Sequence, residues 1–284
     1  MFKVILAGTN PIIWTDVLKN WNAGLIAFIS QKTLFKTRPV VGFIHALVAW
    51  GFTLYLLVNI VDVLYGFIPN FKFLPNSITG DIYRIFVDTF SILVLIGVFY
   101  FLARRFIIQE ERLTIKDPVL LYDSAKAGIK LDSYIVGAFI ILHIGSRFLS
   151  ASFEIAIHGT DWSQPAANMV ATIWSTLSPN TLTIAEHVTW WLALGLILLF
   201  LPYFPYSKHA HVFMGPLNIM ASDERRSMAA IETIDFENED LDQFGAGQIQ
   251  HLPQTQLLDG YACIQCSRCP VSYTHLTLPT NREV

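Results

Sequence analysis

Three cysteines near the end of the chain have the spacing of iron–sulfur ligands. Cys263, Cys266 and Cys269 form a C-x2-C-x2-C run, and the sequence has no other cysteine. Thiolates with two-residue gaps wrap one corner of a 4Fe-4S cubane, and the usual run adds a fourth cysteine followed by proline. A zinc site, which normally pairs two CxxC motifs or adds histidine, and free thiols are the alternatives. The spacing favours a 4Fe-4S cluster on a cytoplasmic segment, where disulfides are rare.

Histidines in and beside apolar stretches have the chemistry to ligate haem b. Haem b takes two neutral imidazoles from facing helices at one depth, one on each side of the porphyrin. At about 1.5 Å per residue, His45 lies roughly 8 Å inside the cytoplasmic edge of its apolar stretch, near the level of His211. We expect His45 and His211 to form an axial pair. The alternative is that His209 and His211 are surface residues beside Lys208.

A second haem would need another histidine pair at a common depth. His187 opens the fourth apolar stretch, near the opposite face of the membrane, and is the first candidate. His143 lies near mid-membrane, roughly 15 Å from His187 in depth. His158 is closer in depth but sits at the edge of its stretch. The partner of His187 is therefore left open.

Polar side chains follow one face of the third apolar stretch. Their spacing of 4, 3, 4 and 4 places them on one side of a helix: His143, Arg147, Ser150, Glu154 and His158. A buried Arg147 needs a partner, which could be Glu154, a haem propionate or a quinone carbonyl. The residues on this face either form a path for protons or only neutralise one another as an ion pair.

Two further groups of charges need an explanation. Glu186 precedes His187 and could take up protons at the outer surface. Its position at an exposed helix start explains the presence of a charged residue equally well. Arg84 and Asp88 are one helical turn apart, so we expect them to pair with each other.

Four apolar stretches are long enough to hold these residues in a bilayer, which needs about 20 residues of helix. They run from Val40 to Val61, Ile85 to Ala103, Ser133 to Gly159 and Ile184 to Ser207. Of the 284 residues, 53% are hydrophobic and only 14% charged, against about 25% charged in soluble domains. We expect an all-α membrane protein, a bundle of four transmembrane helices with a truncated cytoplasmic iron–sulfur segment.

Lysine and arginine gather before the first stretch, between the second and third, and after the fourth, whereas the other two loops hold little, Lys72 and, directly before the second stretch, Arg84. The positive-inside rule therefore places both termini and the middle loop in the cytoplasm. The first forty residues lack the pattern of a signal peptide. The net charge of -3, without a basic stripe, excludes a nucleic-acid partner.

The segments outside the spans are polar or amphipathic. Trp14 to Leu34 is expected to form an amphipathic helix along the inner membrane surface, with a soluble cap as the alternative. In chain order, the expected domains are an N-terminal amphipathic cytoplasmic segment 1–38, a four-helix haem-b domain 39–212, an acidic cytoplasmic linker 213–256, the start of a 4Fe-4S ferredoxin-type domain 257–269 and a non-native tail 270–284.

Parts of the chain resemble a known family. The stretches "QKTLFKTRPVVGFIHALVAWGF", "WWLALGLILLFLPYFPYSKHAHVF" and "LLDGYACIQCSRC" are similar to membrane haem-b subunits like the gamma subunit of respiratory nitrate reductase, fused to a heterodisulfide-reductase-type domain. The resemblance covers about Gln31 to Cys269. It implies a subunit of the prokaryotic cytoplasmic membrane with haem b, electron exchange with menaquinone or another quinone, and a cytoplasmic domain with two 4Fe-4S clusters. It also implies His45 and His211 as the inner haem pair.

The sequence departs from this family at three places. Relatives often have a histidine directly after "WWL", where this chain has Ala193, so a second haem is expected only if His187 substitutes. Relatives begin with an extra span, so Met1 is not expected to be the natural start. The text "VSYTHLTLPT" resembles the translation of a transposase sequencing adapter. The chain is therefore expected to be truncated after Cys269, with a foreign tail from about Pro270.

Together these patterns predict an oxidoreductase component of a respiratory chain. It would pass electrons between a quinone pool and a cytoplasmic iron–sulfur, heterodisulfide-reductase-like partner through haem b. No catalytic residue is assigned, and a chain cut inside its cluster motif is not expected to be active alone. The alternatives are a proton- or ion-coupled transporter and an anchor of a redox complex without a cofactor. Four spans without inverted repeats or broken helices disfavour a transporter.

Overall fold

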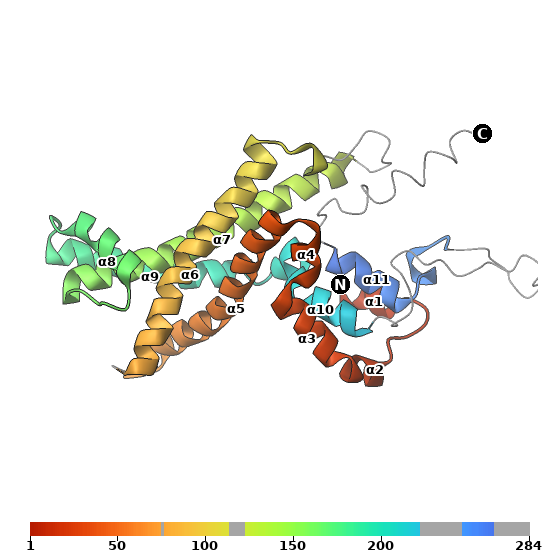
Figure 1. Ribbon diagram of the computed structural model, residues 1–284, viewed down its shortest axis with the longest axis horizontal. Helices are drawn as coiled ribbons and strands as arrows, with labels where there is room; N and C mark the ends of the chain where they lie inside the picture. The colour runs from red at the N-terminus through yellow and green to blue at the C-terminus, as the bar shows by residue number, and fades with distance from the viewer. Residues whose placement is uncertain (75–76, 114–122, 222–245, 264–284) are drawn as a thin grey trace, which may run out of the picture. The chain divides into compact units, whose positions relative to one another are not determined.

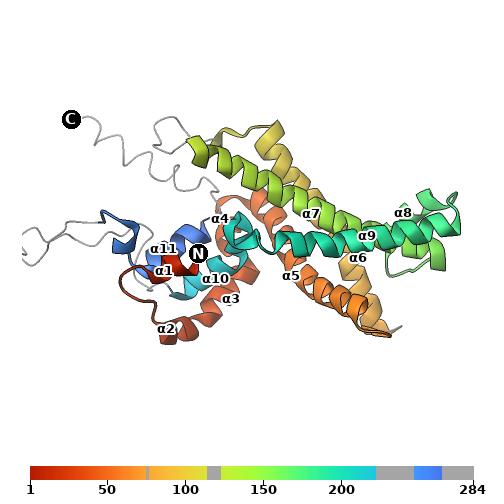
Figure 2. The same ribbon diagram turned by 180° about the vertical axis from the view of Figure 1, so that it is seen from behind.

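The computed structural model describes residues 1–74, 77–113, 123–221 and 246–263, and every regular element in these ranges is a helix. The chain divides into two compact units (Figures 1 and 2). One comprises Leu34–Tyr203, and the other comprises Met1–Thr33 together with Phe204–Val284. The expectation of an all-α fold is confirmed for the described residues.

The first unit, here called the bundle, holds four long apolar helices: α5 (Pro39–Phe67), α6 (Ile78–Leu102), α7 (Asp123–His158) and α9 (Pro179–Phe200). A π-helical turn, η1 (Ala103–Ile107), continues α6, and a short 3-10 turn, η2 (Glu111–Leu113), follows. Within the described residues, four helices are long and apolar enough to cross a membrane. They correspond to the four spans predicted from the sequence.

The fourth helix has different bounds from the predicted span. The sequence predicts a span from Ile184 to Ser207, but α9 starts at Pro179 and ends at Phe200. Pro202 and Pro205 cannot donate a backbone hydrogen bond, and their rings clash with a continuing helix. At the other end, the Ser178 hydroxyl accepts a hydrogen bond from Thr181 N at 3.2 Å and so extends the helix backwards.

The bundle packs around α7, which lies along α9 and against α6 (Figure 1). One buried cluster, Tyr55, Val58, Val94, Val98 and Ile144, joins α5, α6 and α7. A second cluster, Phe148, Ala151, Ile155, Ala167 and Ala171, joins α7 to α8 (Pro165–Ala171). The 3-10 turn η3 (Thr172–Trp174) follows α8 and leads towards α9.

Glycine allows α5 and α6 to approach each other closely. A Cβ atom at Gly51 would lie 2.2 Å from Val94 Cγ2, and one at Gly97 would lie 2.6 Å from Val48 Cγ2. Such distances are far below van der Waals contact, so any side chain at either position would push the helices apart. By contrast, a Cβ at Gly145 on α7 would have no atom within 4 Å.

We therefore expect Gly51→Ala to lower the stability of the bundle by about 1–3 kcal/mol through overpacking. Gly145→Ala is the matched control and should be neutral or slightly stabilising, because alanine is a better helix former than glycine. The measurement is the thermal unfolding temperature of each purified variant in detergent. Equal unfolding temperatures for the two variants would contradict the close approach of α5 and α6.

The second unit, here called the head, consists of short helices from both ends of the chain. They are α1 (Phe2–Leu6), α2 (Trp14–Lys19), α3 (Trp21–Ser30), η4 (Phe204–Tyr206), η5 (Lys208–Ala210), α10 (His211–Ala221), η6 (Ile249–His251) and α11 (Gln254–Ala262). Their common core includes Ile5, Val17, Met214 and Leu258. Helix α10 lies at the start of the predicted linker 213–256, and most of the rest of that linker lies outside the described residues.

The predicted amphipathic helix from Trp14 to Leu34 is not continuous. It consists of α2, α3 and the start of α4 (Lys32–Thr37). Asn20 separates the first two helices with φ -91° and ψ 5°, and Gln31 ends α3 in the left-handed conformation, with φ 50°. Left-handed backbone cannot be continued into a right-handed helix, so the chain changes direction at Gln31.

Candidate functional site: a polar cavity in the helix bundle

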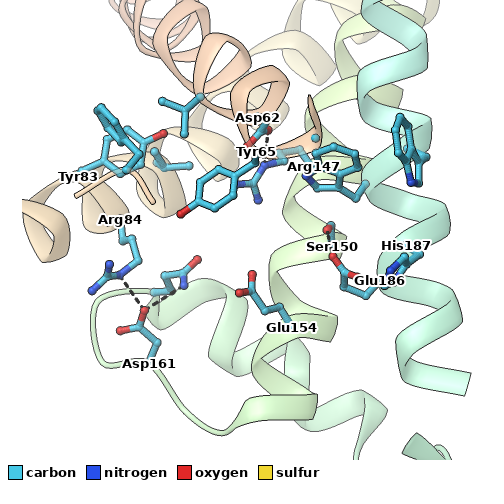
Figure 3. Close-up of a pocket in the computed structure, with 17 residues that line it drawn as sticks. Asp62, Tyr65, Tyr83, Arg84, Arg147, Ser150, Glu154, Asp161, Glu186 and His187 are labelled. Atoms are coloured by element: carbon cyan, nitrogen blue, oxygen red, sulfur yellow. Dashed lines mark hydrogen bonds and ion pairs between the residues drawn. The ribbon is translucent and has the colours of Figure 1, made fainter. Parts of the chain in front are cut away.

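A cavity of about 570 Å³ opens between α5, α6, α7 and α9 within the bundle. Its volume is in the range of small-molecule sites. Figure 3 shows Arg84 and Asp161 on one side of the cavity and Glu186 and His187 on the other, with Arg147 and Glu154 between them. The cavity lies at the end of the bundle that the distribution of lysine and arginine predicts to face away from the cytoplasm. Charged groups inside apolar helices mark it as the candidate site.

An ion pair between α5 and α7 forms one wall of the cavity. Arg147 Nε lies 2.6 Å from Asp62 Oδ2, and the two side chains are only 20% and 11% exposed. The sequence offered Glu154 as one partner for Arg147, but the structure pairs Arg147 with Asp62. Within the described residues, Glu154 makes no ion pair, and its carboxylate lines the cavity. Arg147 is thus neutralised by one carboxylate while a second one faces the open space.

A hydrogen-bonded group connects α7 and α9 on another wall. The Ser150 hydroxyl donates to Glu186 Oε1 at 3.3 Å, and Glu186 Oε2 lies 2.8 Å from His187 Nδ1. His187 Nδ1 also lies 2.9 Å from the carbonyl oxygen of Thr183. A carbonyl oxygen can only accept, so Nδ1 carries the proton and Nε2 has the lone pair in neutral His187. His187 is 66% exposed at the mouth of the cavity, whereas Glu186 is 22% exposed.

The loop after α7 closes the third side through Asp161. Its carboxylate accepts hydrogen bonds from Ser163 N at 2.9 Å, Ser163 Oγ at 2.6 Å and Gln164 Nε2 at 3.0 Å. Arg84 Nε forms an ion pair with Asp161 at 2.9 Å, and Arg84 also contacts Asp81. Burial alone would raise the pKa of Asp161, but these hydrogen bonds and the Arg84 charge hold that pKa below its ordinary value.

The predicted pair of Arg84 and Asp88 is wrong. Arg84 instead pairs with Asp81 and Asp161. Asp88 is buried and accepts hydrogen bonds from Ala166 N at 2.8 Å and Ala167 N at 2.9 Å, at the start of α8. The first N–H groups of a helix have no partner within the helix. A carboxylate at that end accepts their hydrogen bonds and interacts favourably with the positive end of the helix dipole. Asp88 therefore anchors the loop helix α8 onto α6.

The depressed pKa of Asp161 predicts a pH dependence of stability. The ionised form is favoured in the folded state, so its stabilising effect is complete above the ordinary aspartate pKa of about 3.9. It is lost as the pH falls below that value, through the folded-state pKa. We expect Asp161→Asn to unfold at a lower temperature than wild type at neutral pH, with the difference shrinking below about pH 4. A difference in unfolding temperature that stays constant down to acidic pH would contradict this assignment.

His143 lies in the core of the bundle rather than at the cavity. It is 5% exposed, and its Nδ1 lies 2.9 Å from the Ala193 carbonyl oxygen. Nε2 therefore has the lone pair, and no described residue bonds to it. The ring stacks on Phe139 at 5.6 Å and meets Tyr55 edge to face at 6.0 Å. This tautomer is the one that ligates haem.

The two other candidate haem ligands, His143 and His187, lie at different depths in the structure, and the sequence leaves the partner of His187 open. His143 bonds to Ala193, which is six residues beyond His187 on α9, or about 9 Å along the helix. His158 ends α7 and is exposed. The structure therefore does not bring His143 and His187 to a common depth.

The residues of the first predicted pair belong to different units, so their pairing stays a prediction. His45 lies on α5, half-buried, with its ring edge to face with Phe101 at 6.3 Å. His211 begins α10, and its Nδ1 lies 2.6 Å from the Lys208 carbonyl oxygen, which leaves the lone pair on Nε2. Burial lowers the pKa of His211, and it lowers the pKa of His209 to about 4. Neutral imidazole is the form that binds haem iron, so the lowered pKa of His211 suits ligation.

The predicted cluster ligands are only partly described. Cys263 follows α11 directly and is exposed. Helix α11 is held in the head by buried Leu257 and Leu258, which fixes the start of the motif. Cys266 and Cys269 lie outside the described residues, as does the tail 270–284. The described residues contain no group of three histidine, cysteine, aspartate or glutamate side chains suited to a metal ion.

Sequence reasoning missed Asp62, the partner of Arg147. The predicted span ends at Val61, one residue earlier, whereas α5 continues to Phe67. An arginine inside a neighbouring span was the available signal, because it requires a carboxylate at matching depth. Aromatic residues of the cavity, including Tyr65, Tyr83 and Trp190, were also missed. Aromatic side chains are common on helices that face lipid, so the sequence gives no sign that these line a cavity.

Comparison with known proteins finds two curated relatives. The chain is 34% identical over 242 residues to the "Probable iron-sulfur-binding oxidoreductase FadF" of Bacillus subtilis. The aligned region covers 84% of this chain and 32% of that protein. It is 24% identical over 255 residues to the "EtfAB:quinone oxidoreductase" of Syntrophomonas wolfei, covering 88% of this chain and 34% of that protein. The chain thus spans about a third of the length of these relatives. No family model and no solved structure matches it. The chain is therefore related to proteins that are named as oxidoreductases.

Proposed function

We propose that this chain is the membrane electron-transfer part of a quinone-linked oxidoreductase. It would pass electrons between a quinone pool and a cytoplasmic iron–sulfur, heterodisulfide-reductase-like partner through haem b. The cavity beside Arg147 carries the proposal, because a quinone bound in it would lie among charged groups inside apolar helices. The relationship to a quinone oxidoreductase and to an iron–sulfur-binding oxidoreductase supports the same class of reaction.

The cavity lining suits a quinone head group. A quinone presents two carbonyl oxygens that accept hydrogen bonds, and Arg147 and the hydroxyls of Tyr65 and Tyr83 are donors on the walls. Trp190 and Trp191 provide flat apolar surface for its ring. An uncharged head group can enter beside Arg147 because Asp62 already neutralises the guanidinium.

Glu186 is the proposed proton-transfer group at the mouth of the cavity. Reduction of a quinone to the quinol takes two electrons and two protons, and oxidation returns them. The Glu186 carboxylate can accept or give a proton, and the exposed His187 beside it can exchange that proton with water. Ser150 holds Glu186 in place from α7.

His45 and His211 would hold haem b, and the imidazole chemistry of both residues fits this role. Bound there, haem b would supply one-electron redox chemistry. Cys263, Cys266 and Cys269 would hold part of a 4Fe-4S cluster in the complete protein. The transporter alternative uses the same charged cavity without redox change, so a redox measurement separates the two functions.

The test is quinol-driven reduction of the haem in membranes that contain the complete natural protein. Added menadiol, a soluble quinol, should reduce the b-type haem on a timescale of seconds or faster, as followed by its absorption bands. Reduction by dithionite but not by menadiol would refute the quinone link. The absence of any b-type spectrum would refute the haem assignment.

We expect Glu186→Gln to slow this menadiol-driven reduction by about tenfold or more, because glutamine cannot take up the proton. The matched control is Asp123→Asn, which removes a fully exposed carboxylate at the opposite end of α7. That variant should keep the wild-type rate. Equal rates for all three proteins would exclude Glu186 from proton transfer.

A further inference from the structure

One face of the helices α2 and α3 in the head is apolar and exposed. The apolar residues follow helical spacing within each helix: Trp14 and Leu18 lie on one side of α2, and Trp21, Leu25 and Ile29 lie on one side of α3. Leu18 is 72% exposed and Trp14 is 61% exposed. These five residues are called the outer face below.

The opposite side of the same helices packs inside the head. Val17 belongs to its core, together with Met214 of α10. A Cβ at Gly24 would lie 2.6 Å from Met220 and 2.9 Å from the Pro216 carbonyl oxygen, so α3 lies directly against α10. The Asn20 amide also donates to the Met220 carbonyl oxygen at 3.4 Å. Packing against α10 therefore fixes which side of α2 and α3 turns outward.

A third side of α2 is polar. Lys19 pairs with Asp16 at 3.0 Å, and its side chain is 75% exposed. On α3 this side continues through Ala23 and Ser30, with the exposed apolar residue Ile26 between them, 64% exposed. On α2 the outer face is thus bordered by a core-facing side and a solvated side, and on α3 exposed apolar surface extends beyond it.

We propose that the outer face inserts into the cytoplasmic leaflet of the membrane that the bundle spans. Only eight residues separate the end of α3 at Ser30 from the start of α5 at Pro39, so the same bilayer is within reach. Those eight residues include Lys32, Lys36 and Arg38, which suit anionic lipid head groups. Two tryptophans in an apolar stripe are typical of helices at the membrane interface.

This surface is independent of the quinone reaction. It would fix the height of the head, and with it the start of the cysteine motif, at the membrane surface. The competing occupants are a second copy of the chain and the part of the protein that the longer relatives have in addition. Both would bury the same apolar residues against protein instead of lipid, so the chemical identity of the neighbour decides between them.

The test uses a photo-crosslinking amino acid placed at Leu18 of the complete protein in native membranes. The control places the same amino acid at Lys19, which is equally exposed but on the polar side. We expect phospholipid adducts, detected by mass spectrometry, to form several-fold more at position 18 than at position 19. Both positions are on the surface, so neither replacement disturbs the core.

Each other outcome overturns the proposal. Adducts to protein at position 18 would identify an interface with a second copy or with another domain. Equal lipid yields at both positions would show that the outer face has no preference for lipid. The lack of adducts at either position would place the outer face in water. All three results would leave the quinone measurements unaffected.

Discussion

Replacing His45 or His211 by alanine is expected to abolish the absorption bands of a b-type haem. Six-coordinate haem b needs both axial imidazoles, so either loss removes the characteristic spectrum and not just part of its intensity. The measurement is the dithionite-reduced minus oxidised spectrum of membranes that contain the complete protein, normalised to the amount of protein. The expected change is from full intensity to the background level.

Variants of other histidines are the controls for this loss. His158→Ala removes an exposed histidine at the end of α7 and should leave the spectrum intact. His143→Ala should also keep the bands if His143 is only a core residue bonded to Ala193. A loss of about half of the intensity in His187→Ala would indicate a second haem. Intact bands in both His45→Ala and His211→Ala would refute the axial pair.

The long helices were predictable because their signal is strong and local. Twenty apolar residues in succession have few alternatives to a membrane helix, and all four appear in the structure. Boundaries were less predictable. The fourth span ends at Phe200 because two prolines follow it. They stand in the stretch "LPYFPYS", whose apolar composition resembles that of a continuing span. The N-terminal helix breaks at Gln31 because this residue has a left-handed backbone conformation, which is hard to predict from the sequence.

Part of the candidate site was predictable, because that part also depends on a local sequence pattern. Helical spacing placed Arg147, Ser150 and Glu154 on one face, and all three line the cavity. Their partners lie on other helices, and one sequence does not say which helices face each other. Arg84 was therefore assigned to its neighbour Asp88, although its partner Asp161 is 77 residues away in the chain and reaches it only through the fold. Local pairing rules fail where tertiary contacts offer a better partner.

Removal of one member of the Asp62–Arg147 pair is expected to destabilise the bundle strongly. Arg147→Gln leaves the Asp62 carboxylate, which is only 11% exposed, without its partner, and Asp62→Asn does the same to the guanidinium. Breaking a buried pair in this way costs about 3–5 kcal/mol. Both single variants should therefore unfold at clearly lower temperatures than wild type in detergent. The double variant Asp62→Asn/Arg147→Gln has no buried charge at this site and should recover most of the loss.

The same three variants separate a structural role of the pair from a role in the quinone reaction. If Arg147 donates to a quinone carbonyl, the double variant should be stable yet still reduce the haem with menadiol about tenfold or more slowly than wild type, because a charged donor is missing. Arg147→Lys keeps the charge but loses the planar fork, and should show intermediate rates. Recovery of both stability and the wild-type rate in the double variant would show that the pair only holds α5 against α7. In that case the quinone donors must be sought among the tyrosines of the cavity.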